Sequence, residues 1–344
     1  MELGVSTFGM QGPGPDGEIP TARQVLDRTV RLARLADEVG LDLFAAGEHH
    51  RLDMAISSPA VVLAAIAAAT QRIRLTSATT LIGTLDPVRV YEDFATLDLL
   101  SGGRAELIMG RASFIESFQL FGRDLDDSDD LFIEGLELFQ QLNGAPIVSW
   151  RGRFRSPLDA AEIAPRAEGA LPVWVGVGGT PSSAERAGRM GLPMALAILG
   201  GPERFIPFAA MHRAAAVRAG HAPPAVAVAG LGFLADDGTE ARALHEPLYV
   251  AQWRRGLRNR MAGFEVTHEQ YAYEAGPRGG LYVGSPREVA AKLRLQHTWF
   301  GSSRTLVSLD IAGMPEARLR RSIELLGTEV APLVRDLGVP KTRK

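Results

Sequence analysis

Three short segments of the sequence combine residue types that can perform acid–base chemistry or hold a phosphate group. The first is Gly47-Glu48-His49-His50, an acid followed by two imidazoles. The second contains Arg111, whose guanidinium can bind a phosphate or a carboxylate through two parallel hydrogen bonds. The third is the glycine- and hydroxyl-rich segment 176–183. Each segment could also have a purely structural role, so its function depends on the secondary-structure elements around it.

A histidine in the first segment could act as an acid, a base or a hydrogen-bond donor, because its ordinary pKa lies near neutrality. A metal site is the competing interpretation. Neighbouring strand residues point to opposite faces, however, so His49 and His50 would not grip one ion. The chain has no HExxH motif and no obvious third ligand. A histidine that only caps a loop is the remaining alternative.

The segment 176–183 is the best candidate in the chain for a phosphate site. Gly178 and Gly179 would let backbone N–H groups approach an anion, and a helix that begins at Thr180 would add its positive end. Thr180 and Ser183 add hydroxyl groups. The segment is not GxGxxG, and no GxxxxGK[ST] motif occurs. An ordinary glycine turn before a helix is the alternative here, and a surface salt bridge is the alternative for Arg111.

Segments of alternating type predict how these residues are positioned. Eight short apolar segments predict strands, and each precedes a segment with helical periodicity. The predicted strands are residues 3–8, 41–46, 73–82, 105–109, 173–177, 194–199, 225–234 and 305–309. Four helix starts pair a capping residue with proline: Ser58-Pro59, Asp86-Pro87, Thr180-Pro181 and Ser285-Pro286.

Eight strand–helix units without a separating linker predict one α/β domain over residues 1–344, a closed (β/α)8 TIM barrel. An open doubly wound sheet is the second possibility. Two stretches break the pattern and are expected to be insertions or loops. Residues 144–169 could form a hairpin, and residues 262–281 are expected to be irregular.

In such a barrel, ligands bind where strands end and helices begin, and all three reactive segments fall there. The stretch Thr76-Ser77-Ala78-Thr79-Thr80 also has small side chains, which leave room for a flat ligand. The β-propensity of threonine is a sufficient alternative explanation for that stretch. A phosphate site, a flat floor and one histidine together fit flavin mononucleotide, FMN.

Composition excludes several other classes of protein. The net charge is −3, so no basic excess favours nucleic acid or an anionic membrane. The chain has no cysteine, which excludes disulfides, thiolate metal sites and a cysteine nucleophile. It shows neither a signal-peptide pattern nor an apolar run of about 18 residues. We therefore expect a soluble cytoplasmic protein with no metal.

Further motifs follow in a specific order along the chain. They are Gly47-Glu48-His49-His50, Asp86-Pro87-Val88-Arg89, Asp98-Leu99-Leu100-Ser101-Gly102-Gly103-Arg104, Gly110-Arg111, Phe121-Gly122, Gly191-Leu192-Pro193-Met194 and Val283-Gly284-Ser285-Pro286. Their order and spacing resemble those of the bacterial luciferase-like flavin-dependent oxidoreductases, along nearly the whole chain.

The resemblance implies a (β/α)8 barrel that binds reduced FMN and oxygenates a small organic substrate with O2 through a flavin C4a-hydroperoxide. It implies His49 as the active-site histidine, with Glu48 orienting the network around it. The phosphate site would comprise Arg111, Gly179, Thr180 and Ser183, beside Gly178. A non-proline cis peptide at Ser77-Ala78 would lie under the flavin ring. The family also implies a homodimer built through early helices.

Two departures from the family pattern are informative. The light-emitting subunit has a reactive cysteine just before its phosphate-binding arginine, and Gly110 stands there in this chain, so nothing indicates light emission. Residues 262–281 match no luciferase pattern and are the expected lid and specificity element.

Several alternatives stay open. The chain has no nicotinamide fingerprint, which favours supply of reduced flavin by a separate reductase. An oxidoreductase using the 8-hydroxy-5-deazaflavin coenzyme is one alternative. A non-catalytic flavin-binding paralogue is another, and a phosphate-binding barrel without flavin is the last.

Overall fold

A computed structural model describes residues 1–112, 115–257 and 266–338 of the chain. In this described part, eight parallel strands form a closed ring. They are β1 (Glu2–Thr7), β2 (Leu43–Ala46), β3 (Arg74–Ser77), β4 (Ala105–Met109), β7 (Val173–Val177), β8 (Met194–Ala197), β9 (Val226–Leu234) and β11 (Arg304–Ser308). Pairing of β8 with β9 closes the ring, which confirms the predicted barrel and rules out the open sheet.

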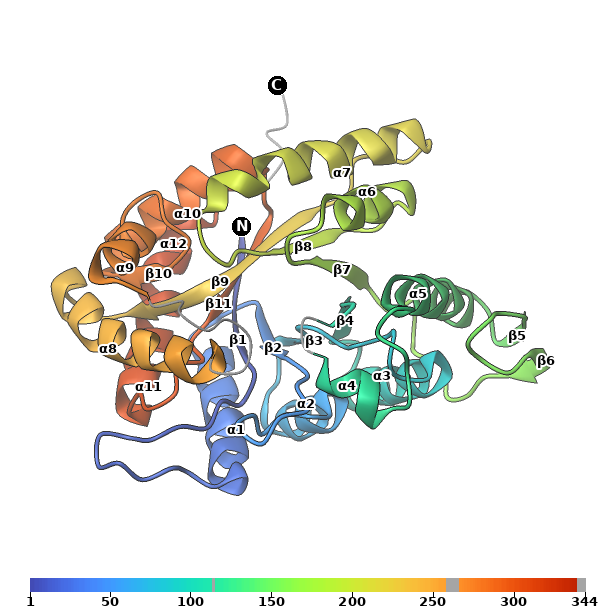
Figure 1. The fold of residues 1–344 in the computed structure, drawn as a ribbon, viewed down its shortest axis with the longest axis horizontal. Helices are drawn as coiled ribbons and strands as arrows, with labels where there is room; N and C mark the ends of the chain where they lie inside the picture. The colour runs from blue at the N-terminus through green and yellow to red at the C-terminus, as the bar shows by residue number, and fades with distance from the viewer. Residues whose placement is uncertain (113–114, 258–265, 339–344) are drawn as a thin grey trace.

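Helices surround the ring of strands (Figure 1). They are α1 (Ala22–Glu38), α2 (Pro59–Ala69), α3 (Pro87–Ser101), α4 (Glu116–Leu120), α5 (Ser128–Gly144), α6 (Pro181–Arg189), η1 (Pro202–Phe205), α7 (Ile206–Arg218), α8 (Gly238–Leu257), α9 (His268–Ala275), α10 (Pro286–Phe300), α11 (Glu316–Leu325), η2 (Leu326–Val330) and α12 (Ala331–Val334). Proline stands in the first turn of α2, α3, α6 and α10, as the sequence predicts. No helix among the described residues is long and apolar enough to cross a membrane.

The structure agrees with the sequence prediction for one of the two irregular stretches and differs for the other. Residues 144–169 contain the antiparallel strands β5 (Ile147–Trp150) and β6 (Leu158–Glu162), a hairpin that extends outward beside α5 (Figure 1). The expectation of irregular structure over 262–281 is wrong, because α9 occupies its centre. Thr267 and Gln270 form a complete capping box that starts this helix. The short strand β10 (Tyr282–Gly284) follows and pairs with the end of β9. Residues 262–265 lie outside the described part.

The third strand is shorter than the sequence suggests. Expected over residues 73–82, it ends at Ser77. Beyond that point the chain continues irregularly beside β4, where the Thr80 N–H donates to the Ile108 carbonyl over 2.9 Å. The bond between Ala78 and Thr79 is a cis peptide.

Alternate residues of each strand face the barrel interior, as the pleat requires. An apolar layer crosses its middle, formed by Leu43, Ala45, Ile108, Trp174, Ala195, Ala227 and Leu306. Ala78 and Ala229 pack against this layer. Below the layer the interior is charged, and above it the inward-facing side chains are small.

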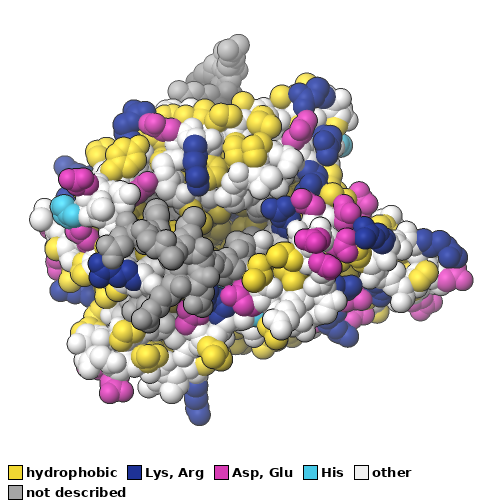
Figure 2. All heavy atoms as spheres, viewed as in Figure 1, with side chains coloured by type: hydrophobic (Ala, Val, Ile, Leu, Met, Phe, Trp, Pro, Cys, Tyr) yellow, Lys and Arg dark blue, Asp and Glu magenta, His cyan; other side chains and the backbone are white. Residues whose placement is uncertain are grey.

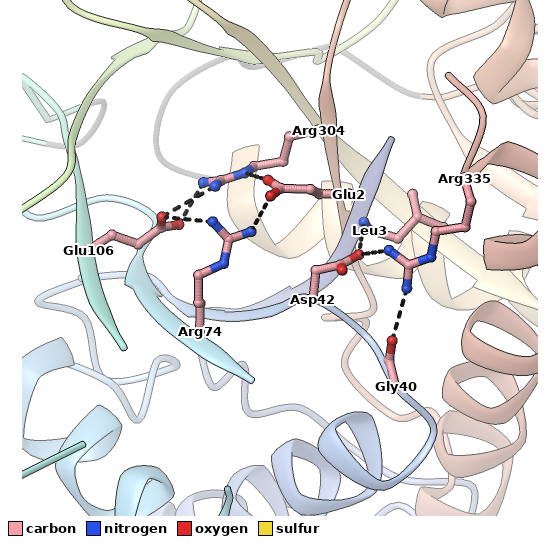
Figure 3. Close-up of polar contacts among 8 residues, drawn as sticks. All are labelled: Glu2, Leu3, Gly40, Asp42, Arg74, Glu106, Arg304 and Arg335. Carbon is pink, nitrogen blue, oxygen red and sulfur yellow. Dashed lines mark hydrogen bonds and ion pairs between the residues drawn. The ribbon is translucent and has the colours of Figure 1, made fainter. Parts of the chain in front are cut away.

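Four charged side chains fill the end of the barrel where the strands begin (Figure 3). Arg304 pairs with Glu106 and with Glu2, and Arg74 reaches the same two carboxylates at 3.7 Å and 2.6 Å. The Arg304 guanidinium lies 4.3 Å from the centre of the Trp174 ring, so the network meets the apolar layer directly. Burial opposes ionisation of Glu2, but hydrogen bonds from both arginines keep its pKa below the usual value.

A second ion pair near this end ties the C-terminal helical segment to the sheet. Arg335 contacts the Asp42 carboxylate and donates to the Gly40 carbonyl over 3.0 Å (Figure 3). Asp42 also accepts the Leu3 backbone N–H over 2.7 Å. The strand-start end of the barrel is thus closed by paired charges.

Candidate functional site

The opposite end of the barrel, where the strands finish, carries the three reactive segments. Figure 2 shows this face hollowed near its centre, with hydrophobic atoms at the floor and a group of acidic and basic side chains beside the hollow. Among the described residues, no group of three or more histidine, aspartate or glutamate side chains is placed to hold a metal ion.

Glu48 organises the loop after β2. Its side chain is buried, and one carboxylate oxygen pairs with His50 Nε2 over 2.9 Å. The other oxygen accepts the Leu81 backbone N–H over 3.0 Å, which ties this loop to the one after β3. Glu48 is therefore a positioning residue that joins two neighbouring loops of the barrel mouth.

His49 faces a different neighbour from His50. Its ring contacts Phe8 edge-on, with ring centroids 4.9 Å apart, while His50 contacts Phe121. The two imidazoles thus diverge, as strand geometry suggests. Burial, reinforced by the positive charge of Arg51, lowers the pKa of His49 to about 4. At neutral pH His49 is an uncharged imidazole that can accept a proton or donate a hydrogen bond, rather than a group poised to titrate near neutrality.

Asp310, which follows β11, supports this arrangement, and sequence reasoning missed it. Its buried carboxylate accepts the backbone N–H groups of Phe8 and Met10, the latter over 3.2 Å. Burial raises the pKa of Asp310, while these hydrogen bonds act in the opposite direction. Phe8 is thereby fixed against His49.

The expected floor of the site is tightly built. The Ser77 hydroxyl donates to the Ile108 carbonyl over 3.2 Å and accepts the Ile108 N–H over 3.3 Å, so β4 engages it. The cis peptide implied at Ser77-Ala78 lies one residue further, at Ala78-Thr79. The placement expected from the resemblance was therefore wrong by one residue. Ala78 faces the interior, above the apolar layer.

Three glycines make room for residues 78 and 79: two directly follow β2 and β4, and the third lies in β7. A Cβ atom at Gly47 would lie 2.7 Å from the Ala78 carbonyl oxygen. A Cβ at Gly110 would lie 2.4 Å from Thr79 Oγ1, and one at Gly176 would lie 2.9 Å from Thr79 Cγ2. Gly110 therefore stands where a cysteine would collide with Thr79.

The segment before α6 is open, as a phosphate cradle requires. Gly178 and Gly179 are exposed, and no atom lies within 4 Å of a Cβ built at either. The φ of Gly179 is +152°, a value that side-chain-bearing residues rarely adopt. The Thr180 hydroxyl makes no capping hydrogen bond, which leaves it for a ligand. Pro181, the first residue of α6, has no N–H, and the Ser183 N–H donates to the Thr180 carbonyl over 3.1 Å. Ser183 lies in the first turn of the helix.

Two arginines lie beside this cradle. Arg111 Nη1 contacts Asp129 Oδ1 over 2.6 Å, and Arg186 Nη2 lies 3.9 Å from the same oxygen. Sequence reasoning missed Arg186. Its spacing in the sequence could have indicated this position, because Arg186 lies three residues, nearly one helical turn, after Ser183 and therefore on the same face of the helix. Burial lowers the pKa of Arg186; Asp129 acts in the opposite direction and Arg111 in the same one.

Comparison with known proteins agrees with this geometry. A family model described as luciferase-like monooxygenase matches residues 1–303. An N-acetyl-S-alkylcysteine monooxygenase of Bacillus subtilis is 40% identical over 97 residues, 28% of this chain and 29% of that protein. A Sinorhizobium fredii protein, y4wF, is 35% identical over 132 residues, 38% of each chain. The chain thus matches well under half the length of these curated relatives.

Solved structures match over far more of the chain. The monooxygenase RslO1 from Streptomyces bottropensis superimposes with a TM-score of 0.85 and 28% identity, over 96% of this chain and 99% of that one. The oxygenating constituent of 3,6-diketocamphane monooxygenase from Pseudomonas putida, solved with FMN, has a TM-score of 0.80 at 22% identity, over 97% and 98% of the two chains. An F420-dependent secondary alcohol dehydrogenase shares the fold at 16% identity, with a TM-score of 0.73 over 97% and 99%.

Fold and site together define a (β/α)8 barrel whose polar ligand groups gather at the carboxyl ends of its strands. With the match over residues 1–303, the chain belongs to the luciferase-like monooxygenase family.

Proposed function

We propose that this protein is a flavin-dependent monooxygenase that uses reduced FMN and O2 to oxygenate a small organic substrate. The observation that supports the proposal is that His49, Arg111 and the open segment 178–183 all follow strands at one end of the barrel, where the residues around Ala78 are small. Arg111, the glycines at 178 and 179, Thr180 and Ser183 would hold the phosphate. Reduced FMN, when bound, supplies the electrons that activate O2.

The donors present fit this cofactor. An anion at residues 178–183 would meet the first turn of α6, and Arg111 would add a charge-assisted hydrogen bond. The small residues around Ala78 leave space for a flat ring above the apolar layer. His49, held against Phe8, would accept a proton from the substrate or donate a hydrogen bond to it. Glu48 would hold the loop after β2, which carries His49, against the loop after β3.

The supply of reduced flavin by a separate reductase belongs to the same proposal, and so does a homodimer. Exposed apolar side chains on α2 and α3, namely Val61, Leu99 and Leu100, support a face between two copies. Sedimentation of the purified protein tests the dimer, and a monomer across the micromolar range would reject it.

The deazaflavin coenzyme is the second candidate, favoured by the fold shared with the F420-dependent dehydrogenase. Its use would make the protein a hydride-transfer enzyme. A flavin-binding paralogue without turnover is the third candidate, and the intact His49 and Arg111 speak against it.

Anaerobic titration with reduced FMN, and separately with the reduced deazaflavin, followed by admission of O2, separates these functions. We expect tight FMN binding and a transient absorbance species before reoxidation. Deazaflavin binding alone would replace the proposal with hydride transfer. FMN binding without turnover of any screened substrate would favour the paralogue, and binding of neither coenzyme would reject a flavin function.

A further inference from the structure

Arg186 differs from Arg104 and Arg304 in how its guanidinium donors are used. Only 13% of its side chain is exposed, and its buried Nη1 atom has no hydrogen-bond partner among the described residues. Arg104, by contrast, donates from its guanidinium to the carbonyls of Ala67 and Ile73. Arg304 is satisfied by Glu2 and Glu106. Buried donors are almost always paired, so the unpaired Nη1 of Arg186 points to a partner that is a ligand.

The position of Arg186 indicates what that ligand is. It extends from α6, the helix whose N-terminus forms the cradle, and lies nearly one turn beyond Ser183. Across from it, Arg111 follows β4. Both guanidinium groups approach the same oxygen of Asp129, at 3.9 Å and 2.6 Å. The loop after β4 and the helix α6 thus bring two cations to one place beside the cradle.

The charge balance of this cluster is incomplete. Two guanidinium groups carry two positive charges, and Asp129 supplies one negative charge between them. The Arg186 side chain also lies against the Phe132 ring, 5.9 Å from its centre, which limits solvation on that side. A phosphate monoester carries about −1.5 to −2 charges at neutral pH and offers three acceptor oxygens. It would supply both the missing charge and the missing acceptors.

We propose that Arg186 is a second phosphate-binding residue, which acts with Arg111 to make the site selective for a phosphorylated flavin over riboflavin. The proposal rests on the proposed flavin function and refines it. Asp129 holds the two like-charged guanidinium groups together, so that both face the phosphate when the flavin enters.

The test is equilibrium binding of FMN and of riboflavin to the full-length protein and its Arg186→Gln variant. We expect FMN binding to weaken about 10- to 150-fold, the loss typical of a charge-assisted hydrogen bond, and riboflavin binding to stay unchanged. Arg189→Gln is the matched control, because it removes an exposed charge from the last turn of the same helix. FMN affinity in that variant should change less than threefold.

Arg186→Lys covers the case in which the glutamine variant does not fold. Lysine keeps the charge but loses the planar fork, so we expect FMN binding between wild type and glutamine, again with no change for riboflavin. Unchanged FMN affinity in either folded variant would overturn the assignment, and so would an equal loss for both flavins. If the wild-type protein binds neither flavin, the proposed function itself fails, and the two failures are thereby distinguishable.

Discussion

The two ends of the barrel use charge in opposite ways. At the end where the strands begin, Glu2, Arg74, Glu106 and Arg304 pair with one another. At the end where the strands finish, Arg186 Nη1, Thr80 Oγ1 and Ser308 Oγ are buried without a partner among the described residues. The four paired charges at the first end stabilise the fold, whereas the three unpartnered groups at the second end are available to a ligand.

The largest effect on activity should come from replacing His49, at the end of the barrel where the strands finish. Replacement by alanine should lower turnover about 10²- to 10⁴-fold, because general acid–base groups contribute that much. FMN affinity should stay near the wild-type value, since the imidazole is not among the groups proposed to hold the phosphate. Steady-state kinetics and flavin titration on the same preparation measure both. Full activity in this variant would remove His49 from the chemistry.

At the end where the strands begin, Glu106→Gln should cost about 3–5 kcal/mol of unfolding free energy, because it leaves the buried Arg304 and the half-buried Arg74 short of a counter-charge. Flavin affinity of the folded fraction should not change. Denaturant unfolding checks the first expectation. The control is Glu203→Gln in the exposed pair with Arg278, which should cost less than about 1 kcal/mol. Similar losses in both variants would contradict the special role of the buried network.

Arg111→Ala should weaken FMN binding by about 1.5–3 kcal/mol and leave turnover at saturating flavin almost unchanged. The reason is that this guanidinium would contact the phosphate and not the reacting ring. Calorimetric binding and kinetics at high flavin concentration make the comparison. Unaltered flavin affinity would place the phosphate elsewhere in the barrel.

The smallest effect concerns pH. His49 has a folded pKa of about 4 against an ordinary value of 6.5, so the unfolded chain binds the extra proton between these pH values. The stability associated with uncharged His49 is therefore fully present above pH 6.5 and is lost as pH falls toward 4. Denaturant unfolding should show a smaller loss over this window for His49→Gln than for wild type. Equal losses would mean that His49 is solvated in the folded protein.

The barrel could be predicted from the sequence because strands and helix starts are marked by residues close together in the chain. Strands 105–109 and 173–177 were predicted at their observed ends, since each is a short, mainly apolar run that stops at a glycine. The capping box at Thr267 was equally local, yet it was overlooked because the surrounding residues lack strong periodicity.

The site was predictable only where ligand groups follow a strand directly. Glu48, Arg111 and residues 178–183 were proposed in this way, and the structure places all of them just after strands. Arg186 and Asp310 were missed because their meaning depends on partners far along the chain: Asp129 for one, and Phe8 for the other. The protonation state of His49 was missed for a related reason, since burial is a property of the assembled barrel.

The three glycines that face Ala78 and Thr79 have a consequence for protein engineering. Any side chain at positions 47, 110 or 176 would press on the same short segment, so libraries that randomise these positions would consist mostly of damaged proteins. Variation aimed at new substrates belongs instead at positions of the strand-to-helix connections that do not face this segment.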